Sequence, residues 1–269
     1  MLGGESVVTL AWAERGGRYD PARVATRAER RGDSYHLTGE KAWVLAGNAA
    51  DQIVVSARTG GADGAADGVS LFVVDADTAG LSRQPLATMD GRRAAHVRLD
   101  CTVPADRLLG AEGGGHAALS RALDIGAAAA CAEGYGVMKT ALQMTVDYLK
   151  TREQFGVKIG MFQALQHRAV DMFIESELAR SMSIMASIKV SEDDAAERQR
   201  AISAAKVHLS QSGKYVAAQS IQLHGGIGVT DEHDIGLYFK RMQVLMSLWG
   251  DEEHHLARYS SLPGFATSL

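Results

Sequence analysis

The chain has 269 residues, of which 46% are hydrophobic, so it is long enough to bury one large or two ordinary cores. Its net charge is −4 with a pI near 6.1, and its basic residues are scattered, which excludes the charge pattern of a nucleic-acid-binding protein. The two cysteines, Cys101 and Cys131, lack metal-ligand spacing, the start of the chain lacks a signal-peptide pattern, and no apolar run approaches the ~20 residues that span a bilayer. We therefore expect two domains in a reduced cytoplasmic setting, with no membrane insertion and no nucleic-acid partner.

Short apolar runs that alternate with polar residues predict an all-β domain over residues 1–112. The expected strands cover residues 6–13, 34–45, 52–57, 69–75 and 95–100. Between two of them, the Gly-, Ala- and Asp-rich stretch Gly60–Gly68 is expected to form a mobile hairpin loop. This part of the chain predicts a small β-sandwich or barrel.

From Gly113 onward the apolar spacing becomes helical, which predicts a second domain over residues 113–269. Helices are expected at residues 116–150, 163–190, 194–224 and 231–247. Ser191 with Asp194 three residues later resembles a capping pattern at the start of the third helix. Four long helices predict an antiparallel four-helix bundle.

Two segments about seventy residues apart, Thr151–Met172 and Ile221–Met242, carry the strongest chemical signal. Each ends one helical pattern and opens another through a Gly-rich turn. Backbone N–H groups and an Arg or Gln side chain at a helix start receive a phosphate well, so the pair of segments indicates a flavin nucleotide. The alternative is that Gly225-Gly226 is only a helix stop and that Arg152 pairs with a surface carboxylate.

The spacing of Arg152, Phe155-Gly156 and Gln163, together with Gln222 three residues before Gly225-Gly226, resembles the acyl-CoA dehydrogenase family. Residues 37–59 look like the strand pair of the family's middle β-domain, and residues 103–110 look like the segment that leads out of it. The resemblance implies an α+β protein whose β-domain precedes the helical bundle. It also implies that a preceding helical domain of roughly a hundred residues is missing here.

In this family a carboxylate removes the α-proton of an acyl thioester while a hydride passes to the flavin. The resemblance places that base at Gly250 or, in some branches, at Gly126, and neither residue has a carboxyl group. We therefore expect no catalytic residue. Asp251 and Glu252 are the weak candidates for a shifted base, although neighbouring helix positions point about 100° apart.

The cluster Asp251–His255 is interpreted as a solvated charge patch at a helix end, and no metal site is expected at His254 or His255 because adjacent helical residues diverge. Asp124 fits an Asp-x-x-Arg that helps to hold CoA in the family, but Ala127 stands at the Arg position. The resemblance thus implies that acyl-CoA is bound mainly by a partner.

The residues that contact the flavin ring in the family are also replaced. Ala13 and Leu45 stand where hydroxyl side chains bond to the isoalloxazine, and they cannot form such bonds. Trp43, which lies in the same stretch, is alternatively an ordinary core aromatic.

Each flavin in the family is shared between two subunits, and this chain retains the set that the neighbouring subunit supplies. The expected FAD-binding residues are Arg152, Phe155, Gln163, Gln222, Gly225 and Gly226. The resemblance therefore predicts the non-catalytic subunit of a heteromeric FAD-dependent acyl-CoA dehydrogenase, as in bacterial α2β2 enzymes of steroid and lipid catabolism. Two alternatives remain: an active homo-oligomer that uses Asp251 or Glu252, and a flavin-free scaffold protein.

Overall fold

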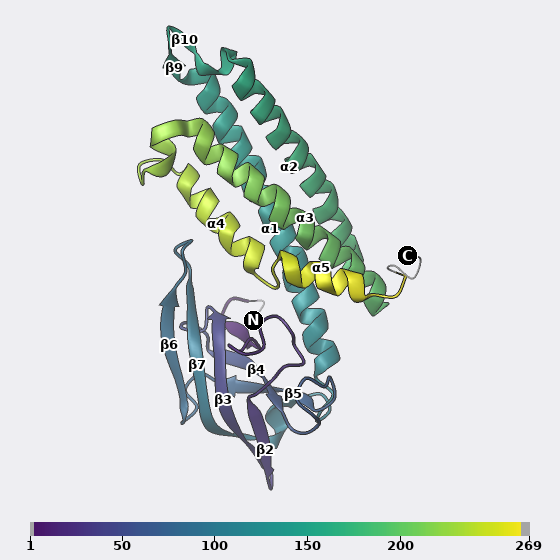
Figure 1. The fold of residues 1–269 in the computed structure, drawn as a ribbon. Helices are drawn as coiled ribbons and strands as arrows, with labels where there is room; N and C mark the ends of the chain where they lie inside the picture. Colours follow the sequence, from purple (N-terminus) through teal and green to yellow (C-terminus); the bar gives the residue numbers. More distant parts are fainter. Residues whose placement is uncertain (1–2, 265–269) are drawn as a thin grey trace. The chain divides into compact units, whose positions relative to one another are not determined.

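The computed structural model describes residues 3–264, and the chain divides into two compact units with the boundary between Ala122 and Leu123 (Figure 1). The first unit holds the β-sheet, and the second holds the helices from the third turn of α1 onward. The domains predicted at residues 1–112 and 113–269 both extend beyond the described residues, and the boundary between them stays a prediction.

The first unit contains one eight-stranded sheet with the order β6-β7-β3-β2-β4-β5-β8, to which β1 adds by pairing with β4. Its strands are β1 (Val8–Ala11), β2 (Arg27–Arg31), β3 (Ser34–Leu45), β4 (Gln52–Arg58), β5 (Val69–Asp75), β6 (Leu81–Ala87), β7 (Arg93–Pro104) and β8 (Leu108–Leu109). Most neighbours are antiparallel, whereas β1 and β2 run parallel to β4. The sequence did not predict the polar strands β2 and β6 or the very short β8. These strands have no clear apolar pattern and are defined by their pairing with neighbouring strands.

The inward side chains of these strands share one hydrophobic core. Along β3 and β7 buried residues alternate with exposed ones, as in a sheet with one covered face. Strands from distant parts of the sheet meet there; the rings of Tyr35 in β3 and Phe72 in β5 lie 5.0 Å apart. The strands therefore pack around a single hydrophobic core, which confirms the predicted small β-domain of the sandwich or barrel type.

The Gly60–Gly68 loop joins the antiparallel strands β4 and β5, which confirms its hairpin position. Arg58 at the end of β4 is buried, and its guanidinium donates to the carbonyls of Gly60, Asp67 and Ala65 at 3.2, 3.1 and 3.0 Å. A buried charged side chain thus anchors the loop. Nothing in the composition of the loop indicates this contact.

The second unit confirms the four predicted long helices, and α3 packs against α2, α4 and α5 (Figure 1). The helices are α1 (His116–Thr151), α2 (Gln163–Lys189), α3 (Ala195–His224), α4 (Ile235–Ser247) and α5 (Glu252–Ser261). Helix α4 begins four residues later than predicted, because residues 225–229 form a 3-10 helix, η3, followed by a turn. Helix α5 was not predicted.

The start of α3 differs in detail from the predicted capping pattern. Asp194 itself is the N-cap, and its Oδ1 accepts hydrogen bonds from the N–H groups of Ala196 and Glu197 at 2.8 and 3.3 Å. Ser191, predicted as the capping residue, lies in the turn before it. Across residues 3–264 no helix has both the length and the apolar character needed to cross a bilayer.

Candidate functional site

Between α1 and α2 the chain forms a two-stranded hairpin, β9 (Glu153–Gln154) with β10 (Val157–Lys158). Its two-residue loop, Phe155-Gly156, has φ angles of 57° and 79°. Positive φ at both positions is typical of a tight hairpin turn, but it is strained for a bulky residue such as Phe. Phe155 is also 91% exposed. Backbone strain at an exposed aromatic residue points to a function outside the packing of this chain.

Arg152 lies at the base of this hairpin and is exposed. Within the described part of the chain its side chain forms no hydrogen bond or ion pair. The neighbouring carboxylate, Glu153, pairs instead with Lys158 at 2.6 Å, and Lys158 also donates to the carbonyl of Thr151 at 3.1 Å. The structure therefore does not place Arg152 in a surface ion pair.

Helix α3 ends at Gly225, where φ is 63° and the backbone N–H donates to the carbonyl of Gln222. A Cβ atom added at Gly225 or Gly226 would meet no other atom within 4 Å. The backbone of Gly225 favours glycine, but packing within the chain does not require glycine at Gly226. Gln222 is exposed, as are both glycines.

A cluster of three rings brings these two segments together. Tyr148, whose carbonyl accepts from the N–H of Arg152, stacks on His224 with ring centroids 4.6 Å apart. His233 lies 4.5 Å from His224 and 6.4 Å from Tyr148. His224 is buried, and its Nδ1 lies 2.7 Å from the carbonyl of Ser220, so that nitrogen carries the proton. The carboxyl-terminal ends of α1 and α3 are thus held next to each other.

The six predicted cofactor residues therefore share three properties: they are exposed, they lie in turns or at helix ends, and within residues 3–264 their side chains have no hydrogen-bond partner. Gln163 is the first residue of α2, and the hairpin connects it to Arg152. Exposed Arg and Gln side chains beside an open glycine turn can receive a phosphate. This set can bind the phosphate end of a nucleotide.

The two positions where the family resemblance places a base lie against other side chains. Gly250 is buried with φ 117°, and a Cβ atom there would lie 2.5 Å from Nε2 of His255 and 2.7 Å from Cδ2 of His254. A Cβ atom at Gly126 would lie 2.7 Å from Cε2 of Trp249. Neither position can hold a larger residue without rearrangement.

The two weak candidates for a base have structural partners. Asp251 is the N-cap of α5, and its Oδ1 accepts from the N–H of His254 at 2.9 Å. Glu252 accepts from Nε2 of Gln211 at 2.7 Å. The charged cluster that follows Gly250 is therefore the capped first turn of α5.

The interpretation of Asp251–His255 as a solvated patch is wrong for His255, which is fully buried. Its Nε2 donates to the carbonyl of Trp249 at 3.1 Å, and its Nδ1 lies 3.2 Å from Oγ of Ser203. Burial lowers the pKa of His255 to about 2, and the positive charges of Lys206 and Arg258 act in the same direction. A residue that packs inside the bundle cannot be recognised from its charged neighbours in the sequence.

Asp124 has a structural role inside the bundle. It is buried and accepts from Nε of Arg198 in α3 at 3.0 Å and from Nη2 of Arg258 in α5. Ala127, at the position of the missing Arg, is also fully buried. Neither residue can reach a CoA group without unpacking the helices.

In the β-unit Trp43 is 59% exposed, with φ 54°, and its ring meets the ring of His96 edge-on at 5.8 Å. The alternative interpretation of Trp43 as a core aromatic is therefore wrong. Ala13 and Leu45 offer backbone carbonyls, which accept from Ala42 N–H at 2.8 Å and Thr9 Oγ1 at 2.5 Å. Their side chains supply no hydrogen bond for a flavin ring.

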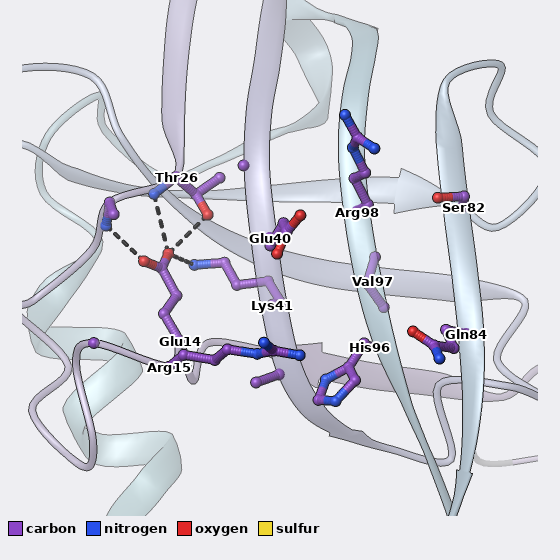
Figure 2. A pocket seen from close by; sticks show the side chains of 14 residues that line it. Glu14, Arg15, Thr26, Glu40, Lys41, Ser82, Gln84, His96, Val97 and Arg98 are labelled. Carbon is purple, nitrogen blue, oxygen red and sulfur yellow. Dashed lines mark hydrogen bonds and ion pairs between the residues drawn. The ribbon is translucent and has the colours of Figure 1, made fainter.

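The β-unit also contains a cavity of about 630 Å³ that sequence reasoning missed (Figure 2). At one side of it Glu14 accepts hydrogen bonds from Nζ of Lys41 at 2.6 Å and from Oγ1 of Thr26 at 2.7 Å. Burial lowers the pKa of Lys41 to about 8, although Glu14 opposes this shift. None of the six predicted cofactor residues lines this cavity.

The described residues contain no group of three His, Cys, Asp or Glu side chains that could hold a metal ion.

Comparison with known proteins matches both parts of the chain to one family. The family models for the middle domain and the C-terminal domain of acyl-CoA dehydrogenases match residues 9–101 and 113–260. Isovaleryl-CoA dehydrogenase of Oryza sativa is 30% identical over 88% of this chain and 58% of its own length. The crystal structure of an acyl-CoA dehydrogenase from Geobacillus kaustophilus superposes with a TM-score of 0.89 at 29% identity, covering 96% of this chain and 68% of that one.

A further solved structure, the Tcur3481-Tcur3483 steroid acyl-CoA dehydrogenase, is 34% identical with a TM-score of 0.83, covering 96% of this chain and 67% of that one. The chain belongs to the acyl-CoA dehydrogenase family. It spans between 56% and 67% of the lengths of eight of its curated relatives.

Proposed function

We propose that this chain supplies the phosphate-binding half of an FAD site that a second acyl-CoA dehydrogenase-family chain completes. The observation that carries the proposal is the contrast between two sets of residues. Within residues 3–264 the side chains of Arg152 and Gln222 are exposed and form no hydrogen bond or ion pair, and the Gly225-Gly226 turn is exposed with open space at both Cβ positions. In contrast, Gly126 and Gly250, where the resemblance places a base, lie against other side chains. Ala13 and Leu45, which are expected at the flavin ring, lack hydroxyl groups.

The residues present fit one part of FAD better than the other. An exposed guanidinium and two exposed glycines with open space at their Cβ positions, on segments joined by the Tyr148–His224 stack, suit a pyrophosphate. In contrast, Ala13 and Leu45 offer no side-chain hydrogen bond to an isoalloxazine ring. This asymmetry supports a site that is shared with another chain.

FAD bound at such a site would accept a hydride from the β-carbon of an acyl-CoA thioester. In this proposal the partner supplies the base and most of the acyl-CoA site, and the present chain binds and orients the phosphate end of the cofactor. The name of the 34% identical Tcur3481-Tcur3483 enzyme, which carries two chain designations, supports a heteromer acting on a steroid or lipid acyl-CoA.

The test is the FAD content of the complex reconstituted with the partner, which would be identified by co-purification from the native host. Arg152→Ala should lower flavin affinity by roughly one to two powers of ten, because a charge-assisted hydrogen bond is lost. Lys139→Ala removes the same charge from an exposed position earlier on α1 and is the matched control.

Flavin absorbance per chain should fall in Arg152→Ala and remain unchanged in Lys139→Ala. The same FAD occupancy in both variants would contradict the proposal that Arg152 binds the cofactor, and absence of FAD from every complex would favour the flavin-free scaffold. Steady turnover of acyl-CoA by the purified single chain would instead favour an active homo-oligomer.

A further inference from the structure

The turn between α4 and α5 is held from the interior of the bundle by two buried residues. Lys206 in α3 is fully buried, and its Nζ donates to the carbonyls of Leu245 and Leu248 at 2.7 and 2.8 Å. It thereby caps the last turn of α4. On the other side of the turn, His255 donates to the carbonyl of Trp249. The backbone between α4 and α5 is therefore fixed at both ends.

Trp249 stands in this turn with a φ of 62°, a conformation that costs a non-glycine residue free energy. In this position its ring lies against α1 at Gly126, where a Cβ atom would come within 2.7 Å of Cε2 and 2.8 Å of Cδ2. Such distances are far shorter than ordinary contact. Glycine at position 126 is therefore required by the ring.

Gly250 lies as close to the side chain of His255 as Gly126 lies to the ring of Trp249. An added Cβ atom would lie 2.5 Å from Nε2 of His255, the nitrogen that bonds to the carbonyl of Trp249. The two glycines thus lie against the side chains of Trp249 and His255, and the His255 ring donates a hydrogen bond to the backbone carbonyl of Trp249.

We infer that Trp249 and His255 form a packed plug that fills the space beside Gly126 and Gly250, so that this bundle is closed to a carboxylate at either position. At Gly250 the positive φ of 117° acts in the same direction, because it disfavours any side chain. The importance of Gly126 and Gly250 as base positions rests on the proposed function. Their contacts with Trp249 and His255 do not depend on it. To restore a base, the plug would have to be removed and a carboxylate introduced.

A double-mutant cycle on thermal unfolding tests the plug directly. Gly136 lies on the same helix as Gly126, and a Cβ atom there would meet nothing within 4 Å. Gly136→Ala should raise Tm by about 1–4 °C, because alanine restricts the unfolded chain and favours helix. Gly126→Ala gains the same helical preference but overpacks the Trp249 ring, so it should lower Tm by about 2–10 °C.

In a Trp249→Ala background the ring is absent, and Gly126→Ala should raise Tm as Gly136→Ala does. Trp249→Gly is the second background; it also removes the ring and suits the positive φ at this position, which protects the test if Trp249→Ala folds poorly.

A rise in Tm for Gly126→Ala in the otherwise unchanged chain would overturn the inference, as would an equal fall in Tm with and without Trp249. This cycle needs neither flavin nor partner. Its failure is therefore distinguishable from failure of the proposed function, which is tested by the FAD content of Arg152→Ala.

Discussion

At the scale of single residues, burial decides the role of the charged and polar groups that the sequence places near the end of the chain. Asp251 and His255 are four positions apart on one helical turn. The first caps α5, and the second is enclosed beneath Trp249. The two residues have similar sequence surroundings but different environments, because one caps the start of a helix at a partly buried position and the other is fully buried.

The buried state of His255 predicts a pH dependence of stability. The unfolded chain takes up a proton at this residue near pH 6.5, whereas in the folded protein burial keeps the ring neutral down to about pH 2. Stability is therefore lost as the pH falls below 6.5. The expected slope from this residue approaches ~1.4 kcal/mol per pH unit between pH 6 and 4.5.

The measurement is urea unfolding of the unchanged chain and of His255→Gln, which has no titrating group, at a series of pH values from 7.5 to 4.5. The free energy of unfolding of the unchanged chain should fall more steeply. Parallel curves for the two proteins would mean that His255 titrates normally in the folded state.

At the scale of elements, the ends of α1 and α3 form the candidate site, and the Tyr148–His224 stack joins them. The helices themselves follow from ordinary apolar spacing. Gly225, which follows α3, and Phe155, in the hairpin after α1, depart from regular structure with positive φ. The hairpin at Phe155 leads to Gln163 at the amino-terminal end of α2, and free backbone N–H groups at a helix start favour an anion.

The two adjacent glycines at the end of α3 should respond differently to substitution. Gly225→Ala forces a Cβ atom into a left-handed conformation and should cost about 1–2 kcal/mol of stability. Gly226→Ala meets no atom and does not have a positive φ, so its stability should change little. In the reconstituted complex, however, Gly226→Ala should reduce FAD content, since the added methyl group occupies space proposed for the phosphate.

Chemical unfolding of each variant, paired with flavin absorbance of its complex, separates the two effects. Full FAD content in Gly226→Ala would show that the phosphate does not approach this turn closely.

At the scale of the whole molecule, α2 presents large apolar side chains to solvent in the isolated chain. The exposed residues on this helix are Val170, Phe173, Ile174, Leu178, Ile184 and Ile188. A continuous apolar helix face is unusual for a monomer and marks an interaction surface.

We expect the chain to associate through α2, with a homodimer forming when no other partner is present. Phe173→Glu with Ile174→Glu places two charges on this face and should shift light scattering at micromolar concentration to the mass of a monomer. Lys214→Glu, a charge change at an exposed position on α3, is the control and should leave the mass unchanged. A monomer before any substitution would contradict the expectation.

The sequence by itself determined the family, the order of the β-unit and the bundle, and the bounds of the long helices to within a few residues. Apolar periodicity and the turn residues are local signals, and they suffice for elements that bury a regular stripe. The sequence also shows directly that glycine stands at positions 126 and 250, where the resemblance places a base.

Only the tertiary structure decided what fills those positions. Gly126 and Trp249 are more than a hundred residues apart in the chain, and their contact depends on how α1 packs near the turn after α4. The burial of His255, the capture of Asp124 by two arginines and the exposure of Trp43 depend in the same way on neighbours that are distant in sequence. Side-chain environment is set by close packing between elements, and local patterns in the sequence carry no record of it.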